Sequence, residues 1–247
     1  MKPFKWISIV VLVALLAAGR LGADEPEVIE VGKFSAAAEG IVFPDGWKPL
    51  TFKKIERHTQ YQLVKENGAV VVKAVSNASS SGLAREITID PRSYPIVQWR
   101  WKVNALLKKA DVARKEGDDY PARLYITFAY EADRVGLIDK AVFEAARLLH
   151  GQYPPLGAIT YIWDGRAPKG TIVPNAYTKR AQMVVVESGA AGLNTWITEE
   201  RNLYEDYKQA FGEEPTMISG VAIMTDTDDT QESAIAYYGD ILFKKGR

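Results

Sequence analysis

Three aspartates stand within four residues near the C-terminus, in the stretch "TDTDDT" that follows the apolar "VAIM". Asp226, Asp228 and Asp229 repel one another at this spacing, so the folded chain must supply either a counter-charge or solvent. Carboxylate oxygens are the ligands that Ca²⁺ prefers, although the stretch lacks the glycine and distal glutamate of an EF-hand loop. Three interpretations follow: a cation site, carboxylate catalysis, or a solvated strand end whose side chains bond nearby backbone amides.

A fourth carboxylate follows in the next strand-like run, and a hairpin of this length would return it toward the other three. The predicted metal set is therefore Asp226, Asp228, Asp229 and Asp240. The alternative is a shared arginine or lysine, which is slightly favoured because no complete ligand set is visible. The cofactor prediction is thus none, or one structural Ca²⁺.

Other catalytic groups are scarce in this chain. It has no cysteine, which excludes a thiol nucleophile and disulfides, and its two histidines are His58 and His150. Neither stands near a G-x-S-x-G motif or in H-E-x-x-H spacing, which argues against a serine triad and a zincin site. Catalysis would have to use carboxylates with tyrosine or arginine, as polysaccharide-cleaving enzymes can. The catalytic candidates are Asp118, Asp119, Asp226 and Asp228.

Period-two geometry assigns the side chains of two strand-like runs to faces. In "IVQWRWKV" the two tryptophans would face the core, which leaves Arg100 and Lys102 on the other face. In "RLYITFAY" the alternating Leu, Ile and Phe point inward, and the opposite face carries Arg123 and Tyr125.

If these runs are neighbouring strands, the four polar side chains form a partly cationic shelf beside the aspartates of "EGDDYPAR". Arginine offers a two-pronged donor to carboxylates and tyrosine a stacking face, so such a shelf suits hydroxyl-rich or carboxylate-bearing sugars. A structural Asp–Arg network at a strand end is the alternative interpretation.

A long polar and aromatic loop is expected in "YIWDGRAPKGTIVPNAYTKR", residues 161–180. Long loops on a β scaffold often carry function. Trp163, Asn175 and Tyr177 therefore join the four shelf residues as candidate ligand-binding side chains.

Short runs rich in β-branched and aromatic residues dominate the chain, and turn sequences such as "ENG" and "DPRSYP" separate them. The runs cover residues 69–76, 83–89, 96–103, 123–130, 158–163, 182–188, 218–224 and 234–243. Because they do not alternate regularly with helices, they predict a mostly β fold, an antiparallel β-sandwich or jelly roll.

Two or three helical insertions interrupt the strands. Residues 136–151 read as a helix that a glycine ends, and Asn202 and Gly212 bracket a second helix with Glu205 placed for a capping box. Residues 104–117 read either as a third helix or as a long ordered loop.

Residues 1–23 read as a secretory signal peptide. Two lysines precede the apolar run Trp6–Ala18, which is shorter than the roughly 20 residues of a spanning helix, and small residues near Ala23 suit cleavage. Cleavage leaves residues 24–247 as one domain, periplasmic or secreted; an uncleaved anchor is the alternative.

The charge and hydropathy of the chain limit the classes of partner that we expect it to bind. Residues 1–23 hold three of the 31 basic side chains and none of the 31 acidic ones, so the cleaved chain carries a small net negative charge. No basic stripe interleaves with aromatic residues, which argues against nucleic acid. No second apolar stretch could span a bilayer, so we do not expect an integral membrane protein after cleavage.

Several stretches, in order from about residue 31 to the C-terminus, resemble a bacterial exported family known as domain of unknown function 3047. They are "GW", "SSSGLAREITIDPRSYPIVQWRWKV", "EGDDYPARLYITF", "YIWDG", "PNAYTKR", "FGEEP", "VAIMTDTDDT" and "AYYGDILF". The resemblance implies a jelly roll similar to galactose-binding-like and carbohydrate-binding modules. In many of those, the closing strand supplies an aspartate, here Asp240, that helps to hold a structural Ca²⁺. The family has no settled activity.

The leading hypothesis is an exported protein that binds a carbohydrate or cell-envelope glycan without catalysis. The first alternative is a polysaccharide hydrolase or lyase that uses the carboxylates. The second is an envelope interaction or assembly protein whose helical insertions form the contact.

Overall fold

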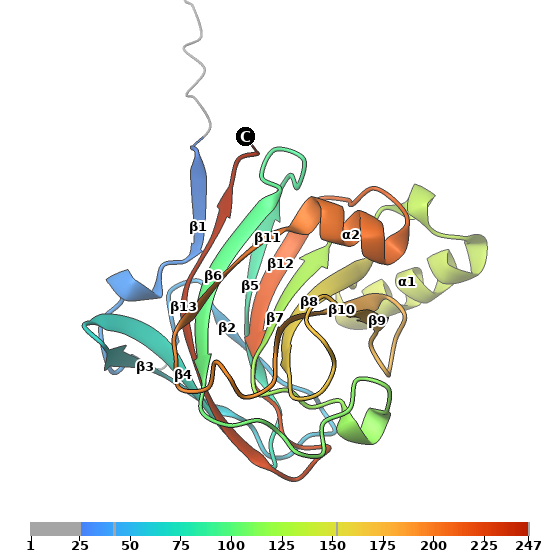
Figure 1. The fold of residues 1–247 in the computed structure, drawn as a ribbon. Coiled ribbons are helices and arrows are strands. Elements are labelled where there is room, and N and C mark those ends of the chain that lie inside the picture. Colours follow the sequence, from blue (N-terminus) through green and yellow to red (C-terminus); the bar gives the residue numbers. More distant parts are fainter. Residues whose placement is uncertain (1–25, 42, 152, 247) are drawn as a thin grey trace, which may run out of the picture.

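The computed structural model describes residues 26–41, 43–151 and 153–246; the predicted signal peptide, 1–23, lies outside them. Two facing sheets form a sandwich, with two α-helices beside it (Figure 1). Sheet A consists of β1 (Val28–Gly32), β3 (Gln60–Glu66), β4 (Ala69–Asn77), β6 (Ile96–Val103), β11 (Ile197–Asn202) and β13 (Ser233–Lys244). Sheet B consists of β2 (Lys48–Leu50), β5 (Gly82–Ile89), β7 (Arg123–Phe128), β8 (Gly157–Asp164), β9 (Ile172–Pro174), β10 (Ala181–Ser188) and β12 (Ile218–Met224).

The C-terminal strands occupy the middle of both sheets. In sheet A, β13 lies between β4 and β6, and in sheet B, β12 lies between β5 and β7. The chain crosses repeatedly from one sheet to the other, and β12 and β13 lie in the middle of the two facing sheets, which is jelly-roll topology. The predicted sandwich is confirmed, with one departure from antiparallel pairing: β8 and β10 run parallel.

Five connections between described strands cross from one sheet to the other at the same end of the sandwich, which we call the crossover end. They are residues 51–59, 78–81, 104–122, 189–196 and 225–232. The register requires this, because the first residue of β13, Ser233, pairs with the last residue of β4, Asn77. Hydrogen bonds tie two of the connections together, for example from the Thr227 amide to the Ser79 carbonyl (2.9 Å).

The core between the sheets is rich in stacked aromatic rings. Trp99 and Trp101 of β6 face inward as predicted, and the ring centroids of Trp99 and Tyr161 lie 4.9 Å apart. Trp163, expected in a ligand-binding loop, is the seventh residue of β8 and is fully buried beside Trp101. It is a core residue because the period-two alternation of β8 continues through it, so its assignment to a loop is wrong.

The two helices that the sequence predicts with definite ends both form. Helix α1 spans Leu137–His150, and α2 spans Leu203–Phe211, where the Asn202 side chain accepts a hydrogen bond from the Glu205 amide (3.1 Å). Leu203 and Tyr207 bury the inner face of α2 at the end of the sandwich away from the crossover end. None of the described helices is long and apolar enough to cross a membrane.

The third predicted insertion is an ordered loop. Residues 104–117 contain one short 3₁₀ turn, Lys115–Gly117; two others, Phe34–Ala36 and Ala132–Arg134, lie elsewhere. The amides of Lys108 and Lys109 bond the Glu232 carboxylate, 3.2 and 3.0 Å away, so these donors are not available to a helix.

Candidate functional site

The predicted shelf divides into two separate places. Arg100 and Lys102 belong to β6 in sheet A, whereas Arg123 and Tyr125 belong to β7 in sheet B. The expectation that these strands are neighbours is wrong, because the connection after β6 crosses to the other sheet. Each pair faces away from the core, so the two pairs lie on opposite sides of the sandwich.

The first place is an aromatic and basic surface on the outer face of sheet A, which we call the cationic platform. It consists of Arg100, Lys102, Trp196 and Tyr237, all partly exposed. The Arg100 guanidinium lies 4.8 Å from the Trp196 ring centroid, and the Lys102 ammonium lies 4.3 Å from that of Tyr237. The two rings lie 6.4 Å apart, so the platform presents aromatic and cationic groups side by side.

The two cations of the platform differ in their partners. Lys102 pairs with Glu66, but Arg100 has no hydrogen bond or ion pair among the described residues. Its side chain lies flat across Gly239, where any Cβ would collide with it. The guanidinium is therefore held in place by packing while its donors stay available to a ligand.

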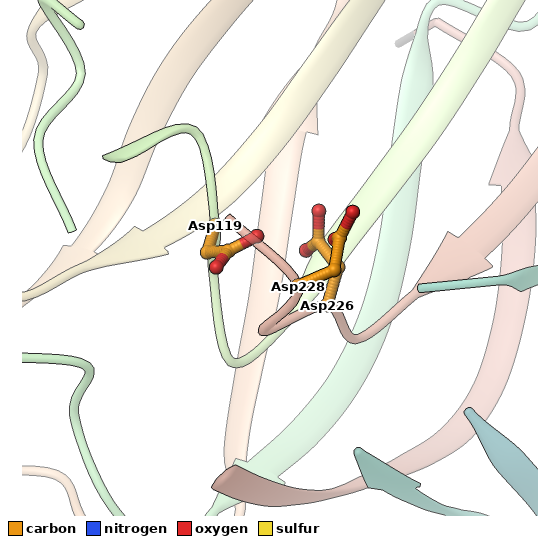
Figure 2. Close-up of side chains that lie close together, drawn as sticks. All are labelled: Asp119, Asp226 and Asp228. Carbon is orange, nitrogen blue, oxygen red and sulfur yellow. The ribbon is translucent and has the colours of Figure 1, made fainter. Parts of the chain in front are cut away.

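The second place is at the crossover end, where five carboxylates form what we call the acidic cluster: Asp118, Asp119, Asp226, Asp228 and Asp229. Asp119 comes from the β6–β7 connection, and it lies across from Asp226 and Asp228 of the β12–β13 connection (Figure 2). One carboxylate oxygen from each of these three lies within 4.8 Å of the others. Asp119 and Asp226 are only 0% and 3% exposed, so the cluster is largely buried.

Arg123 is the basic counter-charge of this cluster. Its Nε donates to Asp226 Oδ1 (2.8 Å), a second nitrogen bonds Asp226 Oδ2, and a third reaches Asp118 Oδ1 at 3.4 Å. Burial by itself would lower the pKa of Arg123, but Asp226, Tyr125 and Asp118 together outweigh burial and raise this pKa, so the guanidinium stays charged. Burial raises the pKa of Asp226, against the influence of Arg123. Arg123 thus gives Asp226 the basic partner that was predicted, but it forms no ion pair with Asp228 or Asp229 among the described residues.

Two of the predicted loop residues also reach the cluster. Asn175 donates to Asp118 Oδ2 (2.7 Å), and the Tyr177 hydroxyl donates to Asp229 Oδ2 (3.1 Å). Both lie in the β9–β10 connection, and Tyr177 is 58% exposed. The fold therefore unites three connections with Arg123, whose hydrogen bond to Tyr125 (3.1 Å) closes the network on the outer side of β7.

Asp240 does not join the cluster. Its carboxylate accepts hydrogen bonds from the Ser35 amide (2.8 Å) and hydroxyl (2.5 Å). The hairpin expectation is wrong because β13 is 12 residues long and Asp240 lies toward its far end. At about 3.3 Å per residue, seven residues carry it roughly 20 Å from the start of the strand.

Family membership follows from a match over most of the chain. The model of the family described as "Protein of unknown function (DUF3047)" matches residues 45–242. The chain belongs to the DUF3047 family. No curated protein is significantly similar to this DUF3047 protein in sequence.

Solved structures resemble the DUF3047 sandwich at low sequence identity. The carbohydrate recognition domain of Emp47p is 11% identical, with a TM-score of 0.44, and covers 92% of this chain and 100% of its own. The family 30 carbohydrate-binding module of a cellulosomal cellulase of Clostridium thermocellum is 9% identical, with a TM-score of 0.40 and coverages of 88% and 98%. The xylan-binding module CBM15 is 11% identical, with a TM-score of 0.35 and coverages of 89% and 97%.

Burial limits what the acidic cluster of the DUF3047 protein can do as folded. A glycosidase needs two carboxyl groups on either side of an open cleft that admits a sugar. Asp119 and Asp226 are closed to solvent, and burial raises the pKa of Asp119. The geometry therefore suits a bound cation or a proton better than the cleavage of a polysaccharide.

Sequence reasoning missed Trp196 altogether. It is the aromatic residue of the polar stretch "GLNTWITEE", directly before β11. A lone tryptophan among polar residues was the available signal, because burial does not account for its position. Helix α1, in contrast, exposes Leu137, Ile138, Val142 and Leu148, the kind of surface that the interaction alternative requires; that alternative stays a prediction.

Proposed function

We propose that this DUF3047 protein is an exported glycan-binding protein whose ligand lies on the cationic platform. The observation that carries the proposal is the unpaired guanidinium of Arg100, lying against Trp196 beside Tyr237. Aromatic faces pack against the apolar faces of sugar rings, and a guanidinium donates to hydroxyl and carboxylate oxygens in fixed geometry. Together they supply the two kinds of contact that a carbohydrate surface needs.

The charge of the platform favours a carboxylate-bearing glycan. Arg100 and Lys102 lie within one strand, and Glu66 pairs with Lys102 alone. A uronic acid residue would bring the anion that Arg100 lacks. Neutral glycans would use the rings without this contribution and should bind more weakly.

The non-catalytic form of the proposal draws support from the burial of the acidic cluster. The carboxylates that a hydrolase or lyase would use, Asp119 and Asp226, are inaccessible to a polymer, and they lie at the crossover end instead of on the platform. Export rests on the signal-like residues 1–23. Mass spectrometry of the protein from its native host should find a chain that begins near Asp24.

The binding experiment uses the cleaved chain and two sets of polysaccharides, one rich in uronic acids and one neutral. We expect saturable binding to a uronic-acid polymer and no release of reducing ends. Trp196→Ala and Arg100→Ala should each weaken binding about tenfold, in line with the roughly 1–2 kcal/mol of a stacking or charged contact.

A matched control is Arg92→Ala, which removes an exposed arginine away from the platform, 3.9 Å from Asp90. It should bind like the parent. Equal affinity of the parent and both platform variants for every polymer would contradict the proposed site, and release of reducing ends that Asp228→Asn abolishes would favour the enzyme alternative.

A further inference from the structure

The acidic cluster contains more buried negative charge than positive charge. Asp118, Asp119 and Asp226 are all buried, and the buried cation Arg123 bonds two of them, Asp118 and Asp226. In their ionised forms these four groups leave two negative charges uncompensated. Charge buried in this way must be balanced by protons or by another cation.

Unpaired oxygens lie at the centre of this imbalance. Asp119 Oδ2 accepts a hydrogen bond from the Thr230 amide (2.6 Å), but Asp119 Oδ1 is buried without any hydrogen-bond partner among the described residues. The carboxylate of Asp228, across from it in Figure 2, likewise receives no hydrogen bond within the described part of the chain. A buried carboxylate oxygen left in this state is costly, so a ligand there would relieve the cost.

The spacing of the oxygens fits a calcium ion. Ca²⁺ binds oxygen at about 2.3–2.6 Å, so two ligands on opposite sides of the ion lie roughly 4.6–5.2 Å apart. The oxygens of Asp119, Asp226 and Asp228 lie within 4.8 Å of one another. Mg²⁺ holds its ligands at about 2.0–2.1 Å in near-ideal octahedral geometry, whereas Ca²⁺ accepts more ligands in a less regular arrangement.

We propose that Asp119, Asp226 and Asp228 bind a Ca²⁺ ion that joins the β6–β7 and β12–β13 connections at the crossover end. The three carboxylates supply oxygen ligands, and water completes the coordination shell. Arg123 bonds both carboxylate oxygens of Asp226 and keeps that carboxylate in place. Asp240 is not part of the proposed site, because its carboxylate accepts a hydrogen bond from the Ser35 amide farther along β13. This proposal does not depend on glycan binding.

Calcium binding is measured on the cleaved chain after chelator treatment and dialysis. Isothermal titration with CaCl₂ should show one saturable site, and the melting temperature should rise with calcium concentration, because a ligand that binds only the folded state stabilises it. MgCl₂ should bind more weakly. Tb³⁺ should replace Ca²⁺ and luminesce on excitation of the aromatic residues, since the Tyr120 ring lies 4.4 Å from the guanidinium of Arg123, which bonds Asp226.

Two variants and a control locate the ion. Asp119→Asn and Asp228→Asn should each lower calcium affinity at least tenfold, whereas Asp240→Asn should leave it unchanged. In the presence of EDTA, Asp119→Asn should melt no lower than the parent, because it removes an unpaired buried charge. That result separates loss of a ligand from loss of the fold.

Three results would overturn the proposal. They are the absence of binding heat and of a melting shift at millimolar calcium, unchanged calcium affinity in Asp119→Asn, and loss of calcium binding in Asp240→Asn with the first two variants unaffected. Absence of calcium binding would mean that protons on the carboxylates balance the buried charge. Loss of binding in Asp240→Asn alone would mean that the ion binds near the far end of β13.

Discussion

Arg100 and Arg123 both lie on the outer faces of their sheets, yet the molecule uses them differently. Each alternates with core residues and points away from the interior of the sandwich. The β10–β11 connection brings the Trp196 ring against Arg100, which stays partly exposed. Three connections converge on Arg123, which is buried and bonded to Asp226 and Asp118. The strand decides which way an arginine points, and the connections decide whether its guanidinium stays available to a ligand or stabilises the fold.

The largest expected effect is that of Arg123→Ala on stability. The substitution leaves Asp226 and Asp118 buried without their cation, which typically costs about 3–5 kcal/mol of unfolding free energy. Urea denaturation monitored by tryptophan fluorescence measures it. Arg100→Ala, the matched change on the platform, should cost less than about 1 kcal/mol. Similar losses for both arginines would break the comparison.

A third side chain makes the stability of the platform region depend on pH. Glu199 is a buried carboxylate in β11, the strand next to β6 of the platform. Burial, with the neighbouring Glu187 carboxylate, raises its pKa to about 7, against the opposing influence of Lys169. The folded chain therefore holds a proton that the unfolded chain, with an ordinary glutamate pKa of about 4.3, releases earlier.

The stability contribution of Glu199 should be fully present below about pH 4.3 and fall as the pH rises to about 7, by up to about 3 kcal/mol. Glu199→Gln should abolish this part of the fall. Glu200→Gln, an exposed neighbour paired with Lys244, serves as the control and should leave it intact. Unfolding curves at pH 5 and pH 7.5 would test this, and parallel behaviour of the two variants would count against it.

A smaller effect should follow from Arg100→Lys, which keeps the charge of the platform but removes the planar donor pair. We expect the affinity for a uronic-acid polymer to fall a few-fold, with an unchanged melting temperature. Added salt should weaken binding by the parent, since the platform is solvent-accessible. If lysine binds as well as arginine, charge alone accounts for recognition.

The smallest expected effect is that of Tyr177→Phe. This change removes a hydrogen bond to Asp229 at the exposed rim of the acidic cluster. The loss should stay below about 1 kcal/mol, because solvent replaces the donor. A loss as large as that of Arg123→Ala would mean that the rim is as important to the cluster as its buried centre.

Local patterns predicted the regular elements well. The alternation in "IVQWRWKV" placed β6 at its observed bounds, and the Asn202 cap and Gly212 bracket α2 as expected. These features depend on residues a few positions apart, so a window of sequence contains their cause. The meeting of Asp119 with Asp226 depends on which strands pair, and over a hundred residues separate them.

The errors had the same origin. The prediction of one polar shelf was wrong because β6 and β7 belong to different sheets. The prediction that Asp240 joins the other aspartates was wrong because β13 is longer than a short hairpin strand. Trp196 was missed because a single aromatic residue outside a periodic run carries little local signal. In each case the missing information was tertiary, so it could not be obtained from periodicity.

The position of β12 and β13 in the middle of both sheets has a consequence for how the chain is made. Both strands come later in the chain than the strands on either side of them, so until they are synthesised, β4 has no link to β6 and β5 has none to β7. Pairs such as β3–β4 and β7–β8 can form earlier, but neither sheet can close across its middle while the chain grows from the N-terminus. If the protein is exported as we propose, these open sheets would leave the earlier strands easier to thread through a translocation pore.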